Sequence, residues 1–249
     1  MTNKLPDYYD EPKFDYHRYW DKRQYEDGAE RVALNKLLVH IKNKNLIGDL
    51  GCGFGRLATL YGPLFKKCIL VDPSQQMLDQ AKNHCQKISN IEFKQGSLES
   101  LPLPDDFLDT ALIVRTLHHL PKLEKAFQEV ARVIKPHGYL ILEYPNKRHF
   151  KNILKKIIRG HLKLDINPIN IATNIQVPFY NFHPEHIHKL LIENKFIIKK
   201  KLSVSNFRCP IIKKVLPTNL LLGLEKISQK TFPSLNLGPS VFILAQKIP

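Results

Sequence analysis

Cysteine and long apolar runs are both scarce in this sequence of 249 residues. Its four cysteines are widely spaced, with no CxxC pair and no rhythm of metal ligands. This pattern favours reduced, mostly buried thiols, a cytoplasmic protein and no metal site. No stretch approaches the roughly 18 consecutive apolar residues of a transmembrane helix. Residues 1–20 are polar, acidic and aromatic, and they lack the apolar core that a signal peptide requires.

Acidic residues are scarce in the second half of the chain. Residues 144–249 hold 18 Lys or Arg against 4 Asp or Glu, whereas residues 1–143 hold 20 against 19. The formal net charge of +15 therefore belongs almost entirely to the second half. Such an excess suits an anionic substrate, a membrane surface or nucleic acid. It also fits a general richness in Lys, Ile and Asn without any specific partner, and the sequence leaves these alternatives open.

Short apolar segments alternate with amphipathic segments along the first half. The expected strands are Leu46–Leu50, Cys68–Asp72, Ile91–Gln95, Leu108–Val114 and Tyr139–Tyr144. The expected helices are Arg56–Phe65, Ser74–Lys87 and Leu123–Ile134. The strand segments are almost continuously apolar, as strands buried on both faces should be. The alternation predicts an α/β fold in which a parallel sheet carries helices on both faces.

Three of the chain's 11 glycines lie within five positions. Gly51, Gly53 and Gly55 follow the first expected strand and precede the first expected helix, so they lie at the carboxyl edge of the sheet, where such folds bind ligands. Asp72 ends the second strand, where a carboxylate can accept the hydroxyls of a ribose. The combination indicates a nucleotide-type ligand, and an ordinary tight turn is the alternative.

The glycine spacing argues against a dinucleotide. The pyrophosphate fingerprint is G-x-G-x-x-G, but here the third glycine comes one residue early and Arg56 stands in its place. Asp49 precedes the turn by two residues. Its carboxylate would repel a pyrophosphate, whereas it suits a cationic amino group.

These residues resemble the class I S-adenosylmethionine-dependent methyltransferases, and in particular those similar to methyltransferase type 11. The first motif of that family looks like the D-L-G-C-G-x-G at residues 49–55, and the resemblance continues in order and spacing through residues 44–146. It implies a Rossmann-like fold, in which a seven-stranded, mostly parallel sheet has helices on both faces and an antiparallel last strand. It also implies S-adenosylmethionine as the cofactor.

The resemblance implies a role for each residue of the motif. The implied cofactor-binding residues are Asp49, Gly51, Cys52, Gly53, Gly55, Asp72, Pro73, Met77, Ser97, Leu98 and Arg115. In this assignment the glycines pack under the methionine part, and Asp49 reaches its amino group through water or backbone. Asp72 binds the ribose, and Pro73 and Met77 line the adenine side.

Ser97 and Arg115 fit the family's cofactor-binding pattern less closely than the other residues do. Many relatives have Asp where this chain has Ser97, so the adenine contact would come from the Ser97 hydroxyl or the Leu98 backbone. Arg115 lies at the position where relatives contact the methionine part of the cofactor through their backbone. Its side chain either faces the cofactor carboxylate or pairs with a nearby acid.

His118 is the candidate catalytic base, because imidazole titrates near neutrality. The alternative is a packing residue that shapes the loop. Methyl transfer also proceeds without a strong base, since the sulfonium is already activated and alignment supplies most of the effect.

The chain is expected to form one domain. Its parts are an N-terminal cap helix (1–43), the cofactor-binding core (44–146), a basic lid insertion (147–182) and a C-terminal helix with strands (183–249). The aromatic residues at 16–25 either close over the cofactor or pack on the sheet. The basic amphipathic stretch at 147–163 suits a substrate lid, a peripheral membrane contact or a core-facing helix.

The leading acceptor is a small molecule of anionic or lipid-like character. The alternatives are an RNA or protein acceptor, or a catalytically silent protein that binds S-adenosylmethionine. The sequence shows no separate RNA-binding domain or stacking motif, which disfavours nucleic acid without excluding it. It specifies neither the acceptor atom nor the oligomeric state.

Overall fold

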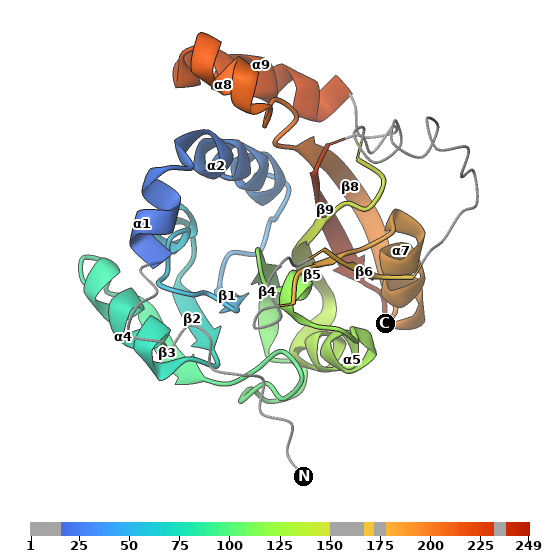
Figure 1. The fold of residues 1–249 in the computed structure, drawn as a ribbon. Coiled ribbons are helices and arrows are strands. Elements are labelled where there is room, and N and C mark those ends of the chain that lie inside the picture. Colours follow the sequence, from blue (N-terminus) through green and yellow to red (C-terminus); the bar gives the residue numbers. More distant parts are fainter. Residues whose placement is uncertain (1–15, 150–166, 172–177, 232–237) are drawn as a thin grey trace.

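The computed structural model describes residues 16–149, 167–171, 178–231 and 238–249, which are built around a seven-stranded sheet (Figure 1). The strand order is β3-β2-β1-β4-β5-β9-β8. The bounds are β1 (Leu46–Leu50), β2 (Lys67–Asp72), β3 (Ile91–Gln95), β4 (Leu108–Ile113), β5 (Ile134–Pro145), β8 (Phe196–Val204) and β9 (Ser240–Lys247). The pairs from β3 to β5 are parallel, whereas β9 is antiparallel to both β5 and β8. The predicted α/β fold with an antiparallel last strand is confirmed.

Helices cover both faces of this sheet (Figure 1). Their bounds are α1 (Tyr16–Asp21), α2 (Gln24–Leu38), α3 (Ala58–Tyr61), the 3-10 turn η2 (Gly62–Leu64), α4 (Gln75–His84), the 3-10 turn η3 (Leu117–His119), α5 (Glu124–Val133), α7 (Pro184–Glu193), α8 (Pro210–Val215) and α9 (Thr218–Thr231). Successive residues of β5 pack against the helices on opposite faces of the sheet. Leu140 and Leu142 belong to the apolar cluster of α5 and α7, whereas Ile141 belongs to that of α2, α3 and α4. This alternation follows from the period of two along a strand.

Two helix ends follow from local sequence. The Ser74 Oγ accepts a hydrogen bond from the Met77 backbone N–H at 3.1 Å, so Ser74 caps α4. The helix expected over Arg56–Phe65 is wrong in its extent, because α3 has only four residues and η2 follows it directly. Pro63 has no N–H with which to continue the α-helical hydrogen bonds, which explains the break.

The strand β5 begins at Ile134, immediately after α5 and five residues before the expected start at Tyr139. Pro136 excludes a continued helix. The residues from Lys135 to His137 are partly or fully exposed, so they did not belong to the apolar pattern from which the strand was predicted. The pairing of β5 with β4 shifts register across this extension.

The insertion between β5 and α7 is described only near its two ends. Its strands β6 (Ile169–Asn170) and β7 (Tyr180–Asn181) pair antiparallel. Phe182 N donates to Pro145 O, and Lys147 N donates to Phe182 O, each at 2.9 Å. The returning chain is thereby joined to the carboxyl end of β5. Most of the amphipathic stretch expected at 147–163, namely residues 150–163, lies outside the described residues.

Two further helices, α8 and α9, lie between β8 and β9, and the sequence analysis did not predict them. They form the outer end of the molecule beyond α2 (Figure 1). Tyr25 Oη of α2 donates to Glu225 Oε2 of α9 at 2.7 Å, so the two helices are joined through a buried polar contact. Among the described helices, none combines the length and the apolar character needed to cross a bilayer.

Candidate cofactor-binding site

Three glycines shape the turn after β1. Gly51, Gly53 and Gly55 have φ angles of +85°, +53° and +74°, a region that side chains with a Cβ rarely adopt. Gly51 N donates to Val71 O at 2.7 Å, which holds the turn against the end of β2. A Cβ on Gly51 would lie 2.3 Å from Thr116 Oγ1, so the turn also fits tightly against the segment after β4. The turn therefore lies at the carboxyl edge of three adjacent strands.

Asp72 ends β2, and its carboxylate points back to the glycine turn. One carboxylate oxygen accepts a hydrogen bond from Gly53 N at 2.8 Å, and the other accepts from Ser74 N at 3.0 Å. The side chain is buried. Backbone N–H groups therefore replace the water that this carboxylate loses. The structure brings together the acid and the turn that the sequence analysis singled out.

Asp49 lies within β1 beneath the turn and is buried. Its Oδ2 accepts a hydrogen bond from Tyr61 Oη at 2.6 Å. Burial raises the pKa of Asp49 from 3.8 to about 7, because the charged form loses its hydration. The Tyr61 hydrogen bond opposes this shift and the Asp72 charge adds to it. A small favourable interaction with a cation is then enough to ionise Asp49 near neutral pH.

Arginine and acidic side chains meet beside the turn. Arg115 Nε donates to Glu30 Oε1 at 2.6 Å, and Arg56 pairs with both Glu30 and Asp27. The Arg56 guanidinium stacks on the Trp20 ring, 3.7 Å from its centroid. Burial would lower the pKa of Arg115, but the Glu30 carboxylate holds it above its usual value. Of the two alternatives for the Arg115 side chain, the structure shows the pairing with an acid.

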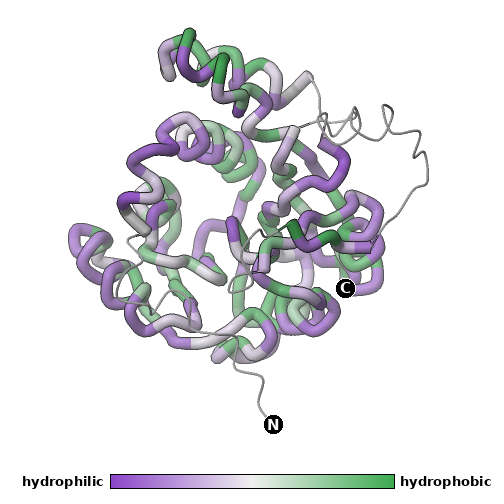
Figure 2. The backbone as a smooth tube through the Cα atoms, in the orientation of Figure 1, coloured by the Kyte–Doolittle hydropathy of each residue, from purple (hydrophilic) through white to green (hydrophobic). Residues whose placement is uncertain are grey.

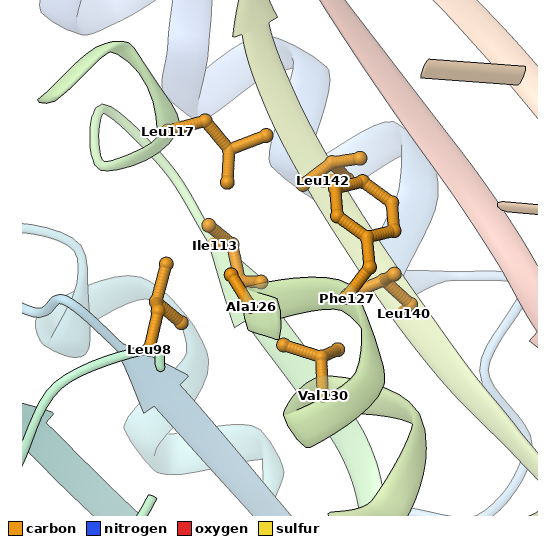
Figure 3. Close-up of a pocket in the computed structure, with 8 residues that line it drawn as sticks. All are labelled: Leu98, Ile113, Leu117, Ala126, Phe127, Val130, Leu140 and Leu142. Carbon is orange, nitrogen blue, oxygen red and sulfur yellow. The ribbon is translucent and has the colours of Figure 1, made fainter. Parts of the chain in front are cut away.

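The residues expected on the adenine side differ in exposure. Met77 is buried in α4, whereas Pro73 is exposed and Ser97 is half-buried. The Leu98 side chain points into an apolar crevice under α5 (Figure 3). A contact between Leu98 and an adenine ring would therefore come from its backbone.

His118 is packed rather than solvated. Its ring lies 4.0 Å from the His119 ring and 4.3 Å from the Phe179 ring, between centroids. Its Nδ1 has no hydrogen-bond partner in the described part of the chain. Burial lowers the pKa of His118 well below 6.5, and the His119 and Arg115 charges add to this effect. The imidazole is therefore neutral near pH 7 and is a weak base.

A family model described as "Methyltransferase domain" matches residues 48–142, the stretch that contains the glycine turn, Asp72 and Arg115. The chain carries an S-adenosylmethionine-dependent methyltransferase domain. The family predicted from the motifs is confirmed, and S-adenosylmethionine is the cofactor of this family.

Two relatives show how far the similarity to this methyltransferase domain extends. The uncharacterized methyltransferase YcgJ of Bacillus subtilis is 33% identical over 126 residues, which make up 50% of this chain and 49% of that protein. The ubiquinone/menaquinone biosynthesis C-methyltransferase UbiE of Campylobacter jejuni is 27% identical over 179 residues, or 69% of this chain and 75% of that protein. The chain spans about half the length or less of several curated relatives that it matches.

Solved structures of methyltransferases share the fold. A methyltransferase from Thermotoga maritima superposes with a TM-score of 0.62 at 20% identity, over 93% of this chain and 94% of that one. The 1,6-didemethyltoxoflavin-N1-methyltransferase of Burkholderia thailandensis, solved with S-adenosylhomocysteine, gives 0.62 at 16% identity over 94% and 84%.

Figure 3 shows a crevice between α5 and the sheet of the methyltransferase domain. It is lined by Leu98, Ile113, Leu117, Ala126, Phe127, Val130, Leu140 and Leu142. Every lining side chain is apolar, so the crevice offers no group that would orient an acceptor. In the described residues, no group of three or more His, Cys, Asp or Glu side chains is arranged to hold a metal ion.

Glu30 is the residue near the site that the sequence analysis did not assign. Its side chain is fully buried on α2, where it joins the two arginines of the turn region. The available signal was the spacing of Glu26 and Glu30, which are four positions apart on one helix face. Both are buried, and a buried acid requires a cationic partner.

Proposed function

We propose that this chain is a methyltransferase that transfers the methyl group of S-adenosylmethionine to a small molecule of anionic or lipid-like character. The observation that carries the proposal is the contact between Asp72 and Gly53, which brings a ribose-binding acid and a glycine turn to one edge of the sheet. In a cytoplasmic setting, the four cysteines would stay reduced, consistent with their being free thiols.

Each part of the cofactor is assigned to a group at this edge. Gly51, Gly53 and Gly55, with Cys52 between them, lie under the methionine part, and Asp49 faces its ammonium group. Asp72 accepts the ribose hydroxyls, while the adenine lies along Pro73, Met77, Ser97 and Leu98. Arg115 contributes its backbone, and its guanidinium fixes α2 over the site through Glu30.

The transfer step requires little from the protein beyond alignment. When bound, S-adenosylmethionine would supply an activated methyl group, and its transfer to a lone pair of the acceptor would leave the S–CH₃ electron pair on sulfur as S-adenosylhomocysteine. The proton of the acceptor passes to water or to His118. Because its pKa is low, His118 is a weak base, and we assign most of the rate enhancement to orientation.

The acceptor is proposed to enter beside η3. Phe179, at the returning end of the insertion, packs on His118, and His119 forms a hydrogen bond with the Pro178 backbone. Residues 178 and 179 of the insertion thus lie next to the end of β4, where the proposed lid would close. The name of the Campylobacter relative, a ubiquinone/menaquinone biosynthesis C-methyltransferase, supports a lipid-like small molecule.

The cofactor assignment is tested by Asp72→Ala. Loss of hydrogen bonds to a charged acceptor costs roughly 1.5–3 kcal/mol each, so S-adenosylhomocysteine should bind at least about tenfold more weakly by calorimetry. Asp79→Ala is the matched control, because Asp79 is an exposed acid of the neighbouring α4. This variant should bind S-adenosylhomocysteine as tightly as the wild type does. Equal affinities for all three proteins, with the fold intact, would refute the site.

The acceptor class is tested by turnover. Release of S-adenosylhomocysteine should be seen with small quinol-like or anionic acceptors, and not with bulk RNA or protein. Turnover confined to RNA or protein would overturn the small-molecule proposal. Cofactor binding without turnover on any acceptor would identify a silent binding protein.

A further inference from the structure

Helix α9 buries polar side chains beside Leu221 on its inner face, and it leaves apolar side chains exposed on its outer face. Glu225 and Gln229 are buried where the helix packs on α2, whereas Leu220, Leu224 and Ile227 face solvent, with Ile227 67% exposed. The three apolar residues are spaced four and three positions apart, so they share one side of the helix. A helix that only packs on a globular core carries polar rather than apolar side chains on its outer face.

Hydrogen bonds hold α9 in this orientation. Glu225 accepts from Tyr25 Oη at 2.7 Å and from Ser205 N at 2.8 Å, and Gln229 Nε2 donates to Ala29 O at 2.9 Å. Turning the helix to bury its apolar side would break all three and leave the Glu225 carboxylate without its donors. The outward direction of the apolar side is therefore fixed by the buried polar contacts.

The neighbouring helix α8 adds to the same outer end of the molecule. Ile211 and Val215 are four positions apart and each is 73% exposed. Hydrophobic residues recur along both helices at this end (Figure 2). We call Ile211, Val215, Leu220, Leu224 and Ile227 the outer apolar stripe. Clustered exposure of this kind marks an interaction site.

The exposed charges on the described residues of α8 and α9 are of one sign. Lys214 lies between Ile211 and Val215 on α8, Lys226 precedes Ile227 on α9, and both lysines are exposed. The only acid of residues 205–239 is Glu225, which is buried. A second copy of the chain would bring like charges together at this surface, whereas an anionic surface would be attracted.

We propose that the outer apolar stripe docks on an anionic lipid bilayer, with its aliphatic side chains in the headgroup region and Lys214 and Lys226 beside the lipid phosphates. Apolar side chains flanked by cations are the pattern of helices that lie in a membrane interface. This surface is separate from the glycine turn, and its role goes beyond methyl transfer.

Co-sedimentation with vesicles tests the proposal. The wild type should bind vesicles of phosphatidylglycerol and phosphatidylcholine at about 0.01 M salt, and binding should fall at least tenfold at about 1 M salt, where the Debye length shrinks from about 30 to 3 Å. Vesicles of phosphatidylcholine alone should bind at least tenfold more weakly. Absence of binding to the anionic vesicles at low salt would refute the proposal.

Two sets of variants locate the contact. Leu224→Gln with Ile227→Gln should reduce the partition coefficient at least tenfold, because two aliphatic side chains no longer enter the interface. Lys214→Gln with Lys226→Gln should reduce it by about fivefold per cation removed. Ile192→Gln is the matched control, since Ile192 is 59% exposed on α7, away from the stripe, and it should leave binding unchanged.

Thermal unfolding and S-adenosylhomocysteine affinity show that each variant is folded. Wild-type partitioning by the folded Leu224→Gln, Ile227→Gln protein would overturn the proposal. So would a loss seen only when Lys151, Lys155, Lys156 and Arg159 are replaced by Gln, because that result transfers the contact to the basic insertion. A dimer that Ile227→Gln dissociates, without lipid binding, would make the stripe a self-association surface.

Discussion

At the residue scale, Asp49 on the buried strand β1 is the side chain that we propose to face the ammonium group of the cofactor. Its pKa of about 7 arises from burial, and it lies close to the pH at which the protein would work. The carboxyl group is therefore largely protonated at pH 6 and largely ionised at pH 8. A cationic amino group of the cofactor would prefer the ionised form, so the proposed contact links cofactor binding to proton release from Asp49.

We predict that S-adenosylhomocysteine binds about tenfold more weakly at pH 6 than at pH 8. The sign follows from the raised pKa, since below pH 7 binding must first remove a proton from Asp49. Calorimetry at the two pH values measures the difference. Asp49→Asn should bind weakly and equally at both, because an amide does not titrate in this range. A wild-type affinity that is independent of pH would contradict the assigned role.

At the element scale, α2 is joined to the turn region by buried charges. The exposed fractions of the Glu30, Arg115 and Arg56 side chains are 0%, 10% and 11%, so water screens these ion pairs little. Removing one partner of a buried pair leaves the others desolvated and unbalanced.

Glu30→Ala should lower the free energy of unfolding by about 3–5 kcal/mol, because it removes the carboxylate to which Arg115 Nε donates and leaves Arg56 with one partner fewer. Urea unfolding measures the change. Asp105→Ala is the control, because Asp105 pairs with Arg132 while 75% exposed. Its loss should cost no more than about 1 kcal/mol. Equal stability of the two variants would show that the buried cluster contributes little.

At the scale of the whole molecule, ligand binding should stabilise the folded chain and distinguish between cofactor types. A ligand at 100 times its Kd stabilises the native state by about 2.7 kcal/mol. For a domain of this size that corresponds to a rise in Tm of roughly 5–10 °C. We predict this rise with S-adenosylhomocysteine and none with NAD, because Asp49 disfavours a pyrophosphate. Thermal-shift measurements distinguish the two ligands. A rise in Tm with NAD alone would contradict the assignment of the site to S-adenosylmethionine.

Local signals in the sequence were sufficient for much of the cofactor edge. The Ser74 cap, the glycine turn and the order of strands and helices depend on residues a few positions apart. The proximity of Asp72 to Gly53 follows from the adjacency of β1 and β2 in a parallel sheet. Features that depend on distant partners were not predicted, such as α8, α9 and the pairing of Glu30 with Arg115.

The sequence by itself determined the strand–helix alternation, the glycine turn and the family, because periodicity, backbone freedom and motif spacing are local properties of the chain. Only the tertiary structure decided the partner of Arg115, the packing of His118 and the outward direction of the apolar face of α9. These depend on which side chains meet when segments up to 200 positions apart come into contact, as Tyr25 and Glu225 do. The free energy of burying a charge or a polar group depends on such contacts, and these contacts cannot be predicted from a local sequence pattern.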